Sequence, residues 1–235
     1  MKAKAVTVAD AVGWFAGGWR IFIRHPALWI VLGLIFLVTA VVLSLVPFLG
    51  GTALTLLSPV LTAGFLHAAR EVDQGRPLQA THVFQGFKAK DKLTRLLALG
   101  GIAVLIWVVV FLALIVFIGG PMMRAMQDDM PAHAASIDAG TFIGLSLVVV
   151  VLTLAMMALL YATPLVMFRG IAVGKAMRSS FVACARNWLP LLVFGVLYGA
   201  VAVLASMPFM LGWLVLLPVT VAMLYRSYSQ MYGDS

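Results

Sequence analysis

The stretch HPALWIVLGLIFLVTAVVLSLVPFLGGTALTLLSPVLTAGFLHAA, residues 25–69, contains no Asp, Glu, Lys or Arg. A helix that crosses the hydrocarbon of a bilayer needs roughly 20 apolar residues, each adding about 1.5 Å of rise. This stretch has 45 residues, enough for two crossings, and Pro47 to Gly51 interrupt it near the middle. It therefore predicts a helical hairpin, with spans near 27–47 and 51–69.

Further uncharged runs follow at 96–123, 139–168 and 187–225. Pro208 and Gly212 divide the last run, so the remaining spans are expected near 96–118, 141–167, 188–206 and 209–227. Only 10% of the 235 residues are charged, whereas an ordinary soluble domain carries about 25%. We therefore exclude a soluble globule and predict an all-α membrane bundle of six transmembrane helices.

Basic residues are concentrated on one side of the predicted bundle. With six spans, 15 of the 16 Lys and Arg residues fall on the side of the segments 1–26, 70–95, 168–187 and 228–235 and their helix ends. Arg124 is the exception. Short loops rich in Lys and Arg stay in the cytoplasm, so both termini are predicted to be cytoplasmic. This distribution also explains the net charge of +8, and we expect no nucleic-acid partner.

Short sequences recur along the chain. Ala11-Val12-Gly13 returns as Ala172-Val173-Gly174, Pro47-Phe48 returns as Pro208-Phe209, and the returning spans carry Pro59, Pro164 and Pro218. We predict one membrane domain, 1–235, built from repeats near 8–70, 80–168 and 171–230, with an external loop at 119–140. Each repeat would be an amphipathic helix followed by a transmembrane hairpin. Chance alignment of apolar sequence remains the alternative.

Helical spacing predicts amphipathic helices at the start of each repeat. In the first, Val12, Phe15, Trp19 and Phe22 share one stripe and Asp10, Gly13, Gly17, Arg20 and Arg24 another. The pattern returns over 173–188 and is weaker over 81–95. Basic residues on such helices lie at headgroup depth, so anionic phospholipid is predicted to bind at Arg20, Arg24, Lys175, Arg178 and Arg186. Alternatively, these charges serve orientation alone.

Other residues are expected to be structural. Trp29, Trp188, Tyr225 and Tyr228 are predicted to form a cytoplasmic aromatic belt. Gly195 and Gly199 form a G-x-x-x-G sequence, which allows close helix packing. We favour packing within the chain, with association of two copies as the alternative.

Catalytic chemistry has no signature in this sequence. No charged residue lies inside a predicted span apart from Arg226, at the cytoplasmic end of the span near 209–227, which argues against a proton-coupled pump. The histidines His25, His67, His82 and His133 are scattered. Met122, Met123, Met126, Met130 and His133 suit Cu(I), but Pro131 interrupts their helix and an apolar interfacial role is favoured. We expect no enzyme, no catalytic residue, no cofactor and no metal site.

Short motifs occur at Gly18-Trp19-Arg20 with Phe22 and Pro26, at Asp73-Gln74-Gly75-Arg76-Pro77, and at Ser180, Ala183, Cys184, Arg186, Asn187 and Trp188. In this order they resemble a family of uncharacterised six-span integral membrane proteins of proteobacteria. More loosely, the chain is similar to the membrane domain attached to some glycerophosphodiester phosphodiesterases. The resemblance implies a bacterial inner-membrane location and supplies no catalytic residues. The second motif predicts a turn, with Asp73 paired to Arg76.

The expected function is that of a non-enzymatic membrane scaffold or accessory subunit. Its partners would be membrane lipids, a second copy or another membrane protein. The alternative is a permease or exporter of a neutral or lipidic small molecule. That alternative predicts a cavity near the prolines, lined by Thr55, Ser58, Thr62, Thr153, Thr163, Tyr198 and Thr220.

Overall fold

The computed structural model describes residues 3–47, 49–120, 123 and 139–233. The helices are α1 (Val8–Ile23), α2 (Pro26–Ser44), α3 (Leu49–Asp73), α4 (Gln85–Lys88), α5 (Lys90–Leu114), α7 (Ala139–Leu159), α8 (Ala162–Arg169), α9 (Val173–Arg186), α10 (Trp188–Ser206) and α11 (Trp213–Tyr232). A 3-10 helix, η1 (Ala80–Phe84), and a π-helical stretch, η2 (Ile115–Gly119), complete them. Within these described ranges there is no strand, and the predicted all-α class is confirmed.

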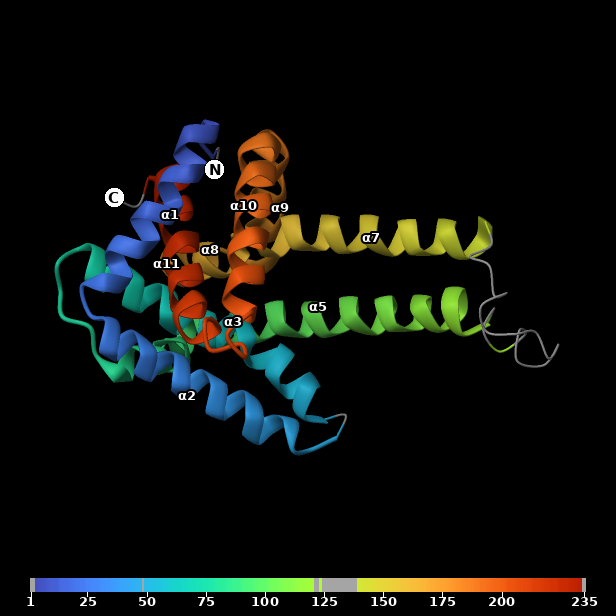
Figure 1. Ribbon diagram of the computed structural model, residues 1–235, viewed down its shortest axis with the longest axis horizontal. Coiled ribbons are helices and arrows are strands. Elements are labelled where there is room, and N and C mark those ends of the chain that lie inside the picture. The colour runs from blue at the N-terminus through green and yellow to red at the C-terminus, as the bar shows by residue number, and fades with distance from the viewer. Residues whose placement is uncertain (1–2, 48, 121–122, 124–138, 234–235) are drawn as a thin grey trace.

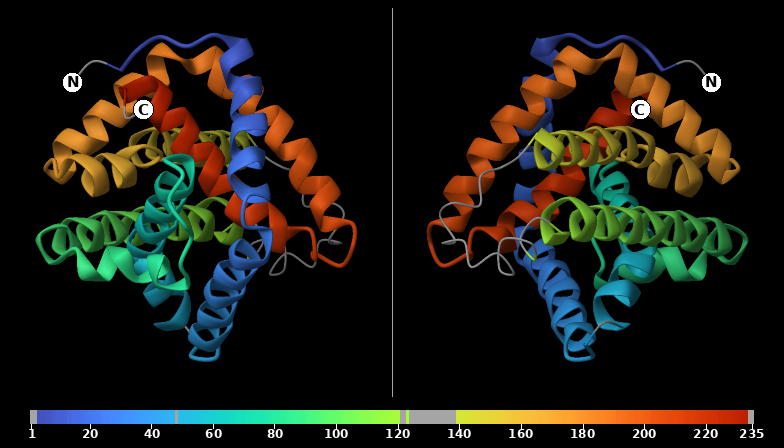
Figure 2. Two further views of the ribbon diagram at one scale, coloured as in Figure 1. Left: turned by 90° about the vertical axis from the view of Figure 1, so that its left-hand side faces the viewer. Right: turned by 90° about the vertical axis from the view of Figure 1, so that its right-hand side faces the viewer.

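The long helices pair as hairpins that diverge from a common base. One hairpin is α2 with α3, the next is α5 with α7, and the last is α10 with α11 (Figure 1). The helices α1, α8 and α9 lie at the base, and both ends of the chain lie there too (Figure 2). The base is therefore the packed part of the molecule, and the hairpins extend away from it.

Several of these helices are long and apolar enough to cross a membrane. They are Pro26–Ser44, Leu49–Asp73, Lys90–Gly119, Ala139–Arg169 and Trp188–Ser206. The remaining predicted span, 209–227, corresponds to α11. This helix is less apolar because its last two turns carry Arg226, Ser227, Ser229 and Gln230, and these turns pack against α1.

The amphipathic helix predicted over 81–95 does not form as one helix. The chain bends at Ala89, which has φ −78° and ψ 69°, so α4 ends before α5 begins. The bend follows from a close backbone contact with α3. A Cβ at Gly86 would lie 2.1 Å from the carbonyl oxygen of Val60, and one at Gly64 would lie 2.0 Å from that of Val83. Only a short segment fits so close to α3.

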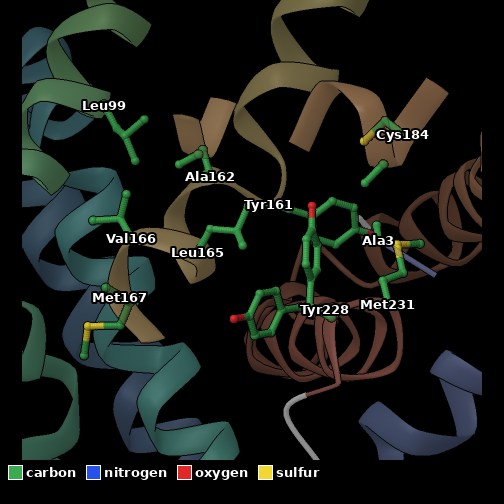
Figure 3. Close-up of a cluster of buried hydrophobic side chains, with 14 of the residues drawn as sticks. Ala3, Leu99, Tyr161, Ala162, Leu165, Val166, Met167, Cys184, Tyr228 and Met231 are labelled. Atoms are coloured by element: carbon green, nitrogen blue, oxygen red, sulfur yellow. The ribbon is translucent and has the colours of Figure 1, made fainter. Parts of the chain in front are cut away.

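The aromatic belt predicted at the cytoplasmic surface is wrong for most of its members. Trp29, Tyr225 and Tyr228 are at most 1% exposed, whereas Trp188 is 62% exposed. Tyr228 packs beside Tyr161, Met231 and other apolar side chains in the core of the base (Figure 3). Tyr225 and Tyr228 are buried because α11 packs against α1, α2 and α3, and Trp29 is buried on α2, which packs against α3 and α11.

The returning span near 141–167 is interrupted one turn before Pro164. Because proline lacks an N–H, it leaves a carbonyl without its helical partner, and here α7 ends at Leu159 and α8 begins at Ala162. The buried Ser180 hydroxyl of α9 closes the break. It accepts the Tyr161 N–H at 3.0 Å and donates to the Met157 carbonyl at 2.7 Å. The helix is therefore interrupted before Pro164, and the Ser180 side chain bridges the interruption.

Replacing Ser180 by Ala is expected to destabilise the protein by about 1–3 kcal/mol, because a buried N–H and a buried carbonyl both lose their partner. Thermal unfolding in mild detergent measures this loss. Ser44→Ala is the control, since the Ser44 hydroxyl also donates to a backbone carbonyl, that of Val41, but is exposed. Equal midpoints for the two variants would show that Ser180 does not hold the break.

Candidate functional site

A close contact between α1 and α11 builds the polar face of the base. Thr7 and Asp10 cap the start of α1 through reciprocal hydrogen bonds. Further along α1, Gly18 touches α11. A Cβ at this position would lie 2.6 Å from the Met223 side chain and 2.9 Å from the Met223 nitrogen. Only glycine permits this approach, and it places the arginines of α1 beside Arg226 of α11.

The arginine pocket lies beside this contact. It has a volume of about 200 Å³ and is lined by Gly17, Arg20, Ile21, Arg24, Asp73 and Arg226. A Cβ at Gly17 would lie 3.1 Å from Nε of Arg226, so the guanidinium of Arg226 covers this glycine. The lining includes three guanidinium groups and a single carboxylate. The arginine pocket therefore carries net positive charge.

Two of these guanidinium groups are held in place by hydrogen bonds to α3. Nη1 of Arg226 lies 2.9 Å and 3.1 Å from the two carboxylate oxygens of Asp73. Nη1 of Arg24 donates to the carbonyl oxygen of Val72 at 2.6 Å. Arg20 is exposed, and its Nε donates to the Ala16 carbonyl at 3.3 Å. Since Asp73 neutralises only one arginine, the arrangement suits an anionic ligand.

A second hollow of about 510 Å³ adjoins the arginine pocket and shares Arg20 and Arg226 with it. Gln230 lies in this hollow. Its amide nitrogen donates to Asp10 at 2.6 Å, and its amide oxygen accepts the Trp14 indole N–H at 2.7 Å. Hydrogen bonds from Thr7 and Gln230 lower the pKa of Asp10. Asp10 therefore stays ionised at neutral pH, and it shares the lining of this hollow with Lys4, Arg20 and Arg226.

The predicted headgroup residues fall into two groups. Arg20 and Arg24 come together in the arginine pocket. Lys175, Arg178 and Arg186 are exposed on α9, which packs against α7 and α8. The structure thus separates basic residues that the sequence placed in one set.

The chain is similar to known membrane proteins. A family model described as "Predicted integral membrane protein (DUF2189)" matches residues 45–168, more than half of the chain. The chain belongs to the DUF2189 family. This DUF2189 protein is 28% identical over 251 aligned residues to a protein of Burkholderia thailandensis named as a probable inner membrane protein. The alignment covers 99% of this chain and 93% of that relative. No solved structure matches.

The family match confirms the expected resemblance to integral membrane proteins without an assigned activity. The similarity to the membrane domain of glycerophosphodiester phosphodiesterases stays a prediction. Among the motif residues of this DUF2189 protein, Asn187 has a structural role. Its side chain accepts the Val6 N–H at 2.8 Å and donates to the Lys4 carbonyl at 3.3 Å. The Lys4 N–H donates to the Met231 carbonyl at 2.9 Å, so the N-terminal segment is also bound to the C-terminal helix α11.

The predicted Asp73–Arg76 pair is wrong. Arg76 instead pairs with Glu71 and contacts Gln74, while Asp73 turns toward α11 and binds Arg226. Two members of the arginine pocket, Asp73 and Arg226, were therefore not predicted from the sequence. One signal was present, since Arg226 is the only charged residue of α11.

Some of the hydroxyl-bearing residues predicted to line a cavity do come together. The hydroxyl pocket, about 300 Å³, is lined by Ser58, Pro59, Thr62, Thr163 and apolar residues of α5, α7 and α11. The other predicted members lie elsewhere. The Thr220 and Tyr198 hydroxyls lie 3.0 Å apart and join α11 to α10, and the Thr55 hydroxyl donates to the Gly51 carbonyl.

Neither the G-x-x-x-G sequence nor the methionine-rich segment forms a site that can be seen among the described residues. A Cβ at Gly195 or Gly199 would meet no described atom within 4 Å, so their packing within the chain is not found among the described residues. Met122, Met126, Met130 and His133 lie outside the described residues. Among the residues that are described, no group of three His, Cys, Asp or Glu side chains could hold a metal ion.

Proposed function

We propose that this protein is a non-enzymatic scaffold or accessory subunit of the bacterial inner membrane that binds anionic phospholipid at its cytoplasmic face. The Burkholderia thailandensis relative is named as a probable inner membrane protein, which supports the location in the inner membrane. The observation that carries the proposal is the arginine pocket, where Arg20, Arg24 and Arg226 face a single carboxylate, that of Asp73. A phosphate or other anionic headgroup would supply the missing negative charge.

The positions of the two termini support six spans. The hydrogen bond from Lys4 to Met231 holds both ends of the chain at the base, and therefore on one side of the membrane. A chain that begins and ends on the same side crosses an even number of times. Five helices among the described residues are apolar enough to cross a membrane, and we take α11 as the sixth crossing. The concentration of Lys and Arg at the base supports a cytoplasmic location for it.

The packing of the short helices supports an internal repeat. The segment that precedes each hairpin packs against the returning helix of another hairpin. Thus α1 lies on α11, η1 and α4 lie on α3, and α9 lies on α7 and α8. The same relation therefore recurs around the base three times.

Replacing Arg20 and Arg24 by Gln is expected to weaken the binding of anionic lipid about thirtyfold. Each basic residue near an anionic leaflet contributes roughly 1 kcal/mol, and two together about 2 kcal/mol. The measurement is mass spectrometry of the phospholipid that co-purifies in mild detergent. Lys88→Gln with Lys90→Gln is the control, because it removes two exposed charges of the base outside the arginine pocket. If both double variants retain the wild-type lipid content, the proposal fails.

The second candidate is a permease or exporter of a neutral or lipidic small molecule, favoured by the hydroxyl pocket beside Pro59. Thr62→Cys tests it with thiol reagents that cannot cross the bilayer. A transporter predicts labelling of Cys at this position from both sides of the membrane. A scaffold with a closed pocket predicts none, and Cys184 is buried and adds no background of its own.

A further inference from the structure

The first helix of two hairpins, α2 and α5, packs closely against the second helix of another hairpin, and a glycine lies at each contact. On α2, a Cβ at Gly33 would lie 3.4 Å from the Leu214 carbonyl oxygen of α11. On α5, a Cβ at Gly100 would lie 2.0 Å from the Leu56 carbonyl oxygen of α3. At Gly100 the two helix backbones meet, and at Gly33 a Cβ would already be in van der Waals contact with α11, so neither place has room for another molecule.

The corresponding joint between α10 and α7 is open. Between them lies the lateral groove, about 540 Å³, lined by Val149, Leu152, Thr153, Met156, Met157, Leu160, Cys184, Trp188, Leu191 and Leu192. Gly195 lies seven residues after the start of α10, as Gly33 does in α2. Yet no described atom lies within 4 Å of where its Cβ would be. One joint of the bundle therefore has space that the other two lack.

The chemistry of the lateral groove excludes a polar occupant. The Thr153 hydroxyl already donates to the Val149 carbonyl at 2.8 Å. Burial raises the pKa of the Cys184 thiol to about 12, so it is neutral at physiological pH. The other lining side chains are apolar, apart from the indole N–H of Trp188 at one end. The occupant must be a hydrocarbon over most of its length.

The lateral groove runs along α7 from Val149 to Leu160, a rise of about 16 Å, and has a volume of about 540 Å³. These dimensions suit a narrow, extended occupant. A single acyl chain is thinner than a helix and is the hydrocarbon that the bilayer supplies.

Basic residues lie on α9, beside one end of the lateral groove. Cys184 and Trp188 line this end, and the exposed Arg186, which is not part of the lining, lies two residues from each of them in the sequence. Arg186 belongs to α9, which also exposes Lys175 and Arg178 and has no acidic residue. A chain in the groove therefore brings its headgroup to a positively charged helix.

We propose that the lateral groove between α7 and α10 binds one acyl chain of an anionic glycerophospholipid, whose phosphate lies against Arg186. This site is separate from the arginine pocket, because it uses other residues and other helices. It can therefore be right or wrong independently of the function proposed above.

The test uses the full-length protein in vesicles of phosphatidylethanolamine and phosphatidylglycerol. The probe is phosphatidylglycerol with a photoreactive group in its acyl chain. We expect crosslinks to be concentrated at residues 149–160 and 188–192. Leu192→Trp fills the groove and should lower this labelling at least about fivefold. Val196→Trp is the control, because Val196 is 66% exposed on α10 and does not line the groove.

Arg186→Gln tests the headgroup. Loss of roughly 1 kcal/mol corresponds to about fivefold weaker labelling by the phosphatidylglycerol probe. Labelling by a phosphatidylcholine probe with the same chain should not change. Leu152→Trp fills the groove from α7, and it replaces Leu192→Trp if that variant does not fold.

Two results would overturn the proposal. One is equal labelling of Leu192→Trp and Val196→Trp, since lipid would then surround the helices without a preferred site. The other is a crosslinked dimer joined through Gly195 and Gly199, since a second copy would then occupy the joint.

Discussion

Gly100→Leu is expected to abolish folding, whereas Gly101→Leu is expected to be tolerated. These neighbouring glycines of α5 differ in what a side chain would meet. At Gly100 a Cβ would lie 2.0 Å from a backbone oxygen of α3, and at Gly101 nothing lies within 4 Å. Overpacking a core typically costs about 1–3 kcal/mol and sometimes more. A backbone atom cannot move aside as a side chain can, so the cost here lies at the upper end.

The measurement is the yield of monodisperse protein in mild detergent, together with the midpoint of thermal unfolding. Gly100→Ala and Gly101→Ala give a graded version of the same comparison. Alanine favours a helix over glycine by up to about 1 kcal/mol, so Gly101→Ala should be neutral or slightly stabilising. If the two alanine variants unfold at the same temperature, α3 and α5 do not meet as described.

The second large effect concerns orientation. A reporter that is active only in the cytoplasm should be active when fused after residue 90 or residue 180. A reporter that is active only outside should work when inserted near Asp128. The reason is that 15 of the 16 Lys and Arg residues share one side of a six-span chain, and such loops remain cytoplasmic.

Each fusion site is its own control, because both reporters can be placed there in turn. The expected signals are all-or-none and opposite for the two reporters. A cytoplasmic signal near Asp128, or an external one after residue 90, would rule out the six-span arrangement.

The apolar runs of the sequence predicted the helices well, because a membrane-spanning helix is decided by its own composition. The stretch 25–69 gave a hairpin whose helices, Pro26–Ser44 and Leu49–Asp73, begin and end within a few residues of expectation. The three prolines of the returning spans have different effects on their helices, which the sequence did not predict. Pro164 interrupts its span, whereas Pro59 and Pro218 lie inside continuous helices.

The candidate site was only partly predictable. Arg20 and Arg24 followed from helical spacing within one segment, which the sequence contains. The Asp73–Arg226 pair joins residues 153 positions apart, and no local pattern fixes how two hairpins align. For the same reason Trp29, Tyr225 and Tyr228 suggested a surface belt. Their burial depends on neighbouring helices and not on their own sequence.

The contact between α1 and α11 has a consequence for how the protein is made. Gly18 and Met223 touch, although 205 residues separate them. At about 5–20 residues per second, α1 waits roughly 10–40 s after its synthesis before its partner exists. During this interval Trp14 and Ile21, both buried in the finished protein, have no α11 to cover them. The apolar side of the nascent α1 must therefore rest on another apolar surface, such as that of the membrane, and the α1–α11 contact forms only after α11 has been made.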